Sequence, residues 1–93
     1  MTYDINWSIA DNTTGCDYCE IDIPNTAKAA ILARKEAWSD RHQFWVDLIT
    51  FDEDGEYTER TVAQGHEPTA HEARIAAEVA FLRLMAGRIE RVA

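Results

Sequence analysis

Apolar and polar residues alternate along several short segments of this chain, and this alternation is the strongest constraint on its fold. In the first segment the apolar positions are Tyr3, Ile5, Trp7 and Ile9. A period of two is typical of a strand with one buried face. Strand-like patterns recur over 16–23, 43–51 and 56–63. We therefore expect a four-stranded, mostly antiparallel sheet with one covered face.

Turn-forming residues separate these segments. The composition of residues 11–15 predicts a turn, and this short connection predicts an antiparallel hairpin between the first two strands. Residues 52–55 are predicted to form a second hairpin turn, in which Gly55 can adopt a positive φ. Residues 64–68, which contain Gly65 and Pro68, are expected to end the fourth strand.

Two helices are expected between and after the strands. Residues 24–26 can end a strand and cap a helix, and the alanine-rich stretch 26–40 then predicts a helix. Thr69 and Glu72 form a capping box ahead of a second helix over 70–91. The expected fold is a single α+β domain over residues 1–93, in the order ββαββα, with both helices on one face of the sheet.

The charge of the chain is strongly negative and unevenly distributed. The 93 residues include 17 acidic and nine basic residues, for a net charge of −8. Residues 1–67 carry a net charge of −9, and residues 68–93 carry +1. Such a charge repels nucleic acid and anionic membranes and attracts basic protein surfaces, although it also serves solubility alone. We expect no direct nucleic-acid binding and no membrane binding.

The N-terminus has neither the basic nor the apolar region of a signal peptide, and no apolar run is long enough to span a bilayer. A cytoplasmic protein, in a bacterial host cell, is the resulting expectation. Cys16 and Cys19 form a C-x-x-C pair, which we expect to be two free thiols packed in a hairpin. A zinc site is the alternative, but it would need two more ligands with suitable spacing. A redox role would need a helix N-terminus beside the pair.

No complete catalytic pattern is present. Ser8 and Ser39 lack a nucleophile motif, and the glycines are too scattered for a phosphate-binding loop. We therefore expect a protein that is not an enzyme and that needs neither cofactor nor metal.

Pleating indicates which side chains occupy the uncovered face of the sheet. If Phe44, Val46 and Leu48 face the helices, their neighbours in sequence must face away. The same reasoning applies to the first two strands. The side chains expected on the uncovered face are Asp4, Tyr18, Glu20, Asp22, Trp45, Asp47 and Ile49. Carboxylates beside aromatic rings are typical of protein interfaces, and carboxylates on a sheet can imitate nucleic-acid phosphates. Alternatively, a loop or a symmetric dimer covers Trp45 and Ile49.

The hairpin turn between the last two strands is acidic and could extend this surface. Its carboxylates are Asp52, Glu53, Asp54, Glu56 and, along the following strand, Glu59. They can be a solvated tip or a contact for Lys and Arg of a partner. Calcium binding would require a twelve-residue ligand pattern that is absent.

In its general character the chain resembles small acidic proteins encoded by phages and mobile elements, including anti-CRISPR inhibitors. The resemblance lies in its length, its acidic excess, its short strands containing Trp, and the junction of residues 65–73 that leads from a hairpin into an alanine-rich helix. It implies stoichiometric binding to a CRISPR effector complex, often by covering a basic nucleic-acid surface. Because these inhibitors share no sequence signature, the resemblance implies no particular functional residues.

These observations lead to two functional hypotheses. In the first, the protein is a non-enzymatic, DNA-mimicking inhibitor of phage origin that binds a basic surface of a protein or ribonucleoprotein. In the second, it is a small accessory or scaffold domain that forms a homodimer through the Trp45 face of the sheet.

Overall fold

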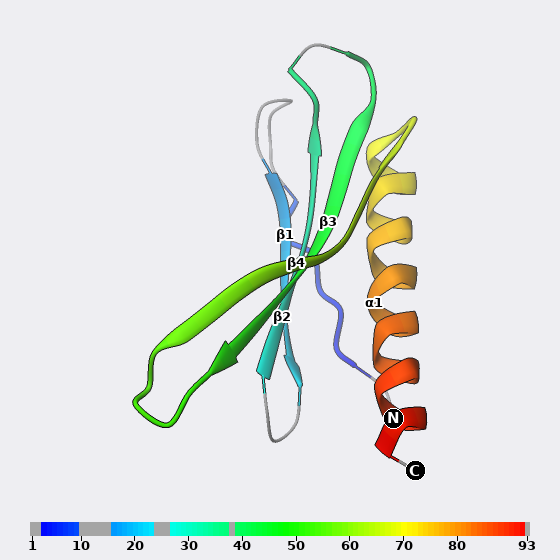
Figure 1. The fold of residues 1–93 in the computed structure, drawn as a ribbon. Helices are drawn as coiled ribbons and strands as arrows, with labels where there is room; N and C mark the ends of the chain where they lie inside the picture. The colour runs from blue at the N-terminus through cyan, green and yellow to red at the C-terminus, as the bar shows by residue number, and fades with distance from the viewer. Residues whose placement is uncertain (1–2, 10–15, 24–26, 38, 93) are drawn as a thin grey trace.

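The computed structural model describes residues 3–9, 16–23, 27–37 and 39–92. Four strands come first and a single helix follows: β1 (Cys16–Ile23), β2 (Ala27–Lys35), β3 (His42–Phe51), β4 (Tyr57–Glu67) and α1 (Ala70–Val92). The strands form one antiparallel sheet in the order β1-β2-β3-β4, and α1 packs across one face of it (Figure 1). The α+β class and the four-stranded antiparallel sheet are confirmed, whereas the order is ββββα and not ββαββα.

The prediction of a helix over 26–40 is wrong, because most of this segment is the central strand β2. Its residues pair with β1 on one side and β3 on the other. Ala29, Ile31 and Ala33 face the core, with the period of two that a strand requires. The helix propensity of alanine is a weak local preference, and two hydrogen-bonded neighbours override it.

The first predicted strand is also corrected. Residues 3–9 are extended but join the sheet only through an isolated bridge, in which Ser8 and Tyr18 exchange backbone hydrogen bonds of 2.8 and 3.0 Å. Tyr3, Ile5 and Trp7 pack against the core. The rings of Tyr3 and Phe81 make an edge-to-face contact, with their centroids 5.1 Å apart. This segment therefore lies on the helix side of the sheet. The predicted turn over 11–15 lies outside the described residues.

The second half of the chain follows the predictions more closely. β3 and α1 lie within one residue of the predicted ranges, and the Thr69 hydroxyl accepts a hydrogen bond of 3.1 Å from the Glu72 backbone N–H. The 52–55 turn is confirmed, with Gly55 at φ 83°. β4 is longer than predicted, since it continues through Gly65 to Glu67 and the predicted break is absent.

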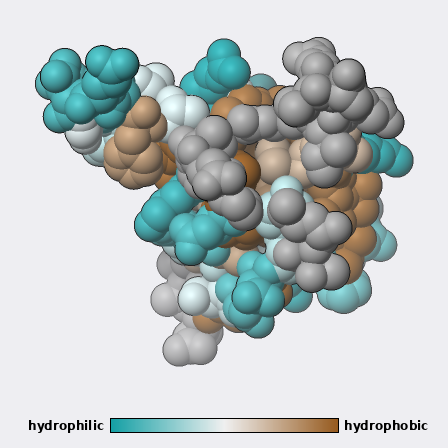
Figure 2. Space-filling model, turned by 90° about the horizontal axis from the view of Figure 1, so that it is seen from below, coloured by the Kyte–Doolittle hydropathy of each residue, from teal (hydrophilic) through white to brown (hydrophobic). Residues whose placement is uncertain are grey.

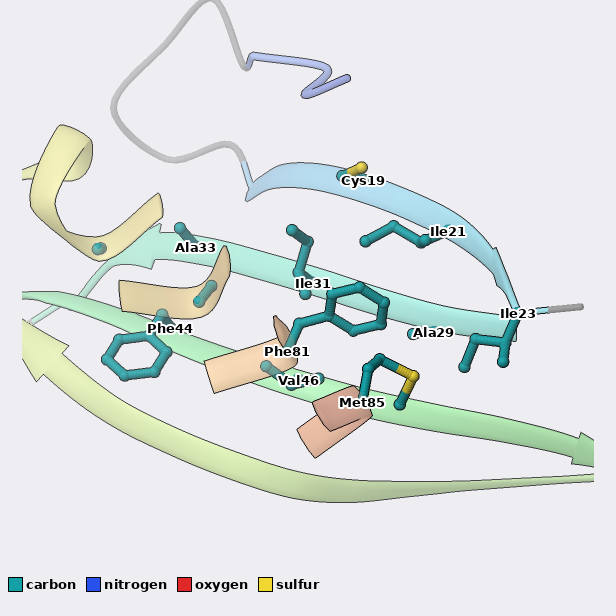
Figure 3. Packing of buried hydrophobic residues seen from close by; sticks show 12 residues of the cluster. Cys19, Ile21, Ile23, Ala29, Ile31, Ala33, Phe44, Val46, Phe81 and Met85 are labelled. Atoms are coloured by element: carbon teal, nitrogen blue, oxygen red, sulfur yellow. The ribbon is translucent and has the colours of Figure 1, made fainter. Parts of the chain in front are cut away.

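The hydrophobic core lies between α1 and the inner face of the sheet. Phe81 and Met85 of α1 lie over β2 and β3, where they meet Ile31 and Val46 (Figure 3). Phe44, Val46 and Leu48 all belong to or pack against this core, as the pleating predicted. Ala29 and Ala33 are fully or almost fully buried, and their small side chains leave room for the helix.

An ion pair joins the start of α1 to the edge strand β1. Arg74 donates a 2.7 Å hydrogen bond to the carboxylate of Asp17, and both side chains are largely buried. The two residues are 57 positions apart in sequence. Removing a charged donor from a buried carboxylate is costly, so this contact contributes to the docking of α1 on β1.

We predict that Arg74→Ala will lower the free energy of unfolding by about 2–3 kcal/mol, because the buried Asp17 carboxylate loses a charged donor. Urea denaturation followed by circular dichroism measures this. Lys28→Ala is the control, since it removes an exposed ion pair and should shift the midpoint far less. Equal midpoints for Arg74→Ala and the unaltered protein would contradict the proposed role of the ion pair.

We also predict that Gly65→Ala will destabilise the fold by about 1–3 kcal/mol, as overpacking does. A Cβ at this position would lie 2.8 Å from two atoms of the Phe44 ring, which covers the glycine from the opposite strand. Gly87→Ala is the matched control. It meets no atom within 4 Å and should stabilise α1 by about 0.5–1 kcal/mol. Thermal unfolding of the two variants should therefore show shifts of opposite sign.

Candidate functional site

The face of the sheet opposite α1 carries most of the residues predicted to bind a partner. No helix or strand in the described part of the chain covers this face (Figure 1). The predicted residues found on it are Tyr18, Glu20, Asp22, Trp45, Asp47, Ile49 and Glu59. We refer to this side as the uncovered face.

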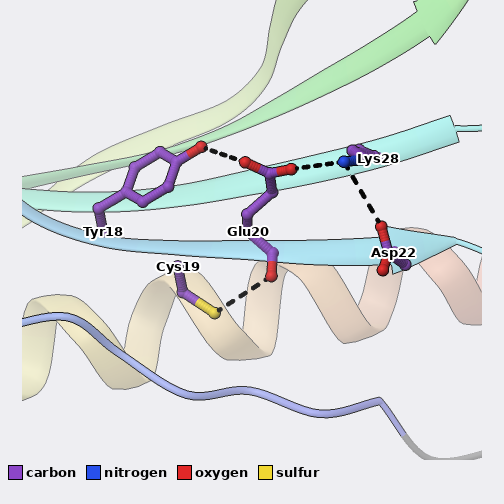
Figure 4. A network of polar contacts seen from close by, with 5 residues as sticks. All are labelled: Tyr18, Cys19, Glu20, Asp22 and Lys28. Carbon is purple, nitrogen blue, oxygen red and sulfur yellow. Dashed lines mark hydrogen bonds and ion pairs between the residues drawn. The ribbon is translucent and has the colours of Figure 1, made fainter.

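A polar network occupies the β1 side of the uncovered face (Figure 4). The Tyr18 hydroxyl and the Lys28 ammonium each donate a 2.9 Å hydrogen bond to the Glu20 carboxylate, and Lys28 also lies 3.9 Å from Asp22. The Lys28 hydrogen bond, with that of Tyr18, lowers the pKa of Glu20. Burial and the hydrogen bond to Glu20 raise the pKa of Tyr18 to about 12. Glu20 is therefore ionised and paired at neutral pH.

A second acidic group lies between β3 and β4. Asp47 is only 7% exposed, and its carboxylate accepts a 2.7 Å hydrogen bond from the Thr61 hydroxyl. Glu59 lies beside Asp47, and the hydrogen bond that the two carboxyl groups share when one is protonated raises the pKa of Glu59. The expectation that Asp47 is an exposed surface charge is therefore wrong. At this point the register between β3 and β4 shifts, because β4 has an extra residue, Val62, between the partners of Val46 and Asp47.

β2 contributes residues that the sequence reasoning did not place here, because this segment was expected to be a helix. Lys28 and Arg34 bring positive charge, and Leu32 lies opposite Trp45. The Arg34 guanidinium lies 5.8 Å from the centroid of the Trp45 ring, within the range of a cation–π contact. Trp45 and Ile49 are half-buried. The uncovered face is thus mixed in charge and less negative than predicted.

The strongest concentration of unneutralised acid lies instead on the end of the β3–β4 hairpin. Residues 50–61, which we call the arm, are all exposed and project away from α1 (Figure 1). In the end-on view of Figure 2, hydrophilic surface gathers on the protruding part of the molecule at the upper left. The predicted residues on the arm are Asp52, Glu53, Asp54, Glu56 and Glu59.

The tip of the arm is a well-defined turn. The Asp52 carboxylate accepts hydrogen bonds from the backbone N–H groups of Asp54 and Glu56, at 2.9 and 3.0 Å. Just behind the tip, Phe51 and Tyr57 are 54% and 67% exposed, and their ring centroids are 6.4 Å apart. The arm therefore offers acidic groups beside an exposed aromatic pair, and aromatic side chains are enriched at interfaces.

One predicted residue lies elsewhere. Asp4 is exposed, but it belongs to the segment that packs on the helix side of the sheet, so it is not part of the uncovered face. The prediction was wrong because residues 3–9 were taken as a full strand of the sheet.

The two cysteines lie on opposite sides of β1. Cys19 is buried in the core, whereas Cys16 is partly exposed and the intervening pattern alternates. Burial raises the pKa of both thiols. Two side chains on opposite faces of one strand cannot hold one metal ion together. Among the described residues, no three His, Cys, Asp or Glu side chains are grouped closely enough for a metal site.

Comparison with protein-family models, with curated proteins and with solved structures gave no match. Within the residues that the structure describes, α1 lacks the apolar character that a membrane-spanning helix requires.

We predict that Glu59→Gln will raise stability at neutral pH by about 0.2–1 kcal/mol, the range of exposed charge pairs. The raised pKa of Glu59 means that folding favours its protonated form, so this group costs stability as pH rises above its ordinary value of 4.5. The free energies of unfolding of Glu59→Gln and the unaltered protein should be equal near pH 4 and should differ increasingly toward pH 7. Urea midpoints at the two pH values measure this.

Glu20→Gln is the matched control with the opposite sign. The pKa of Glu20 is lowered, so its contribution is present above the unfolded-state pKa and is lost as pH falls. This variant should be less stable than the unaltered protein at pH 7, and the gap should close in acid. A loss of stability at pH 7 in Glu59→Gln would contradict the assigned Asp47–Glu59 pair.

Proposed function

We propose that this protein is a non-enzymatic acidic binding protein, and that it uses the arm, together with the uncovered face, to bind a basic surface of another macromolecule. The observation that carries the proposal is the tip of the arm, where four carboxylates lie beside two exposed aromatic rings on a hairpin that projects from the body. The carboxylates are those of Asp52, Glu53, Asp54 and Glu56.

The electrostatics favour the arm as the primary contact. The acids of the uncovered face are partly neutralised, since Lys28 pairs with Glu20 and Asp22. The four acids at the tip of the arm take part in none of the ion pairs found in the described part of the chain. Their charge is therefore available to a partner's Lys and Arg, and it would steer association at low ionic strength.

The finer proposal is that the partner is a nucleic-acid-handling complex of a bacterial cell and that the protein is a phage inhibitor of the anti-CRISPR type. The supporting observations are the net charge of −8 and the resemblance in general character. Carboxylates spaced along a narrow hairpin can enter a groove that is shaped for phosphates. Occupying that groove would block nucleic acid by competition, without chemistry.

The triple variant Glu53→Gln, Asp54→Asn, Glu56→Gln tests the proposal, because it removes charge while Asp52 still closes the turn. Purified CRISPR effector complexes are titrated with the protein, and their binding to target DNA is read by mobility shift. We expect the unaltered protein to inhibit DNA binding and the triple variant to need at least about tenfold more protein. Raising the salt concentration should weaken inhibition.

The matched control removes three exposed acids outside the arm and the uncovered face: Asp4→Asn, Asp40→Asn, Glu72→Gln. It has the same net charge as the arm variant and should inhibit nearly as well as the unaltered protein. If both triple variants lose inhibition to the same extent, net charge alone determines the inhibition and the arm has no special role. If the unaltered protein inhibits none of the purified CRISPR effector complexes, the anti-CRISPR proposal is rejected.

A further inference from the structure

The helix α1 is apolar on two different sides. One stripe faces the sheet and consists of Ala73, Ala77, Phe81 and Met85, all buried. On another side, Ile75, Val79 and Leu82 are 45%, 40% and 45% exposed. In Figure 2, apolar surface is visible on the side of the molecule that carries α1. A surface helix normally has one apolar stripe, so the second stripe is a candidate contact surface.

The spacing of the second stripe is that of a helix-pairing seam. The intervals between Ile75, Val79 and Leu82 are four and three residues, and the exposed Ala86 follows after four more. Alternating intervals of four and three are the pattern by which one helix packs along another. We call these four positions the outer seam.

A groove runs beside the outer seam. It has a volume of about 570 Å³ and lies between α1 and the ends of β3 and β4. Its apolar lining comprises Phe44, Ile75, Ala76, Val79 and Ala80, and Glu67, Glu72 and Arg83 are among its charged residues. The small side chains of Ala76 and Ala80 allow a second helix to approach closely.

We propose that the outer seam binds the outer seam of a second copy of this chain, with the two α1 helices antiparallel about a two-fold axis. The charge distribution selects this occupant. Two copies, each of charge −8, repel one another, and the acidity lies in residues 1–67, whereas residues 68–93 carry +1. α1 is therefore the surface on which two copies meet with the least repulsion.

The charges on α1 itself favour the antiparallel arrangement. Glu72 and Glu78 lie in its first half, and Arg83 lies in its second half. Arg74, which also lies in the first half, is engaged by Asp17. Antiparallel pairing places the acidic half of each helix beside Arg83 of the other copy. A two-fold contact is also self-complementary and closed, so it ends at a dimer.

This inference goes beyond the proposed function and differs from a dimer through the Trp45 face. It uses the opposite layer of the molecule, so the arm and the uncovered face stay accessible in both copies. The two contacts also respond oppositely to salt. Screening weakens the binding of an acidic arm to a basic partner, whereas it relieves the repulsion between two acidic copies and strengthens an apolar contact.

Sedimentation equilibrium of the full chain, at about 5 to 500 µM and at about 0.05 and 0.5 M salt, tests the proposal. We expect a monomer–dimer equilibrium that shifts toward dimer at the higher salt. Val79→Glu and, separately, Leu82→Glu place a charge in the seam and should raise the dissociation constant at least about tenfold. Both residues are well exposed, so the circular dichroism spectrum and Tm at low protein concentration should persist.

Trp45→Ala on the uncovered face is the control and should dimerise like the unaltered protein. A protein that is monomeric at both salt concentrations would overturn the proposal. A dimer that is lost in Trp45→Ala but kept in Val79→Glu would also overturn it. Neither result bears on inhibition of effector complexes by the arm, so the two proposals fail separately.

Discussion

The packing of one helix across a four-stranded sheet is the contact on which the rest of this structure depends. α1 supplies Phe81 and Met85, which are buried against β2 and β3. The helix can come this close because β2 presents Ala29 and Ala33 at the centre of the sheet. The described residues contain one helix, and residues 3–9 add Tyr3, Ile5 and Trp7 to the cover of the core. No helix or strand of the described chain covers the opposite face of the sheet.

Much of the fold could be predicted from local sequence, and the main error has an identifiable cause. α1 was found because Thr69 and Glu72 give a helix start that is independent of tertiary contacts. β2 was missed because alanine favours a helix locally, while the competing signal comes from hydrogen bonds to two other strands. β4 continues past Gly65 for a similar reason, since that glycine makes room for the Phe44 ring. Neither effect is visible within the segment concerned.

The candidate site was predicted in part. Pleating placed the side chains of β1 and β3 on their correct faces, because that rule needs only the strand itself. The contribution of Lys28, Leu32 and Arg34 could not be foreseen once β2 was taken as a helix. Asp47 is buried and accepts a hydrogen bond from Thr61 of a neighbouring strand, a contact that its own strand does not reveal. The electrostatic character of a sheet face therefore follows from strand order, which the sequence alone does not provide.

The separation of the arm from the core has an evolutionary consequence. Residues 50–61 are all exposed, and the turn at Asp52 is held by its own local hydrogen bonds. Substitutions at the exposed carboxylates Glu53, Asp54 and Glu56 therefore leave the packing of α1 on the sheet unchanged. A hairpin built in this way separates the chemistry of its tip from the stability of the core, so that the two can change independently.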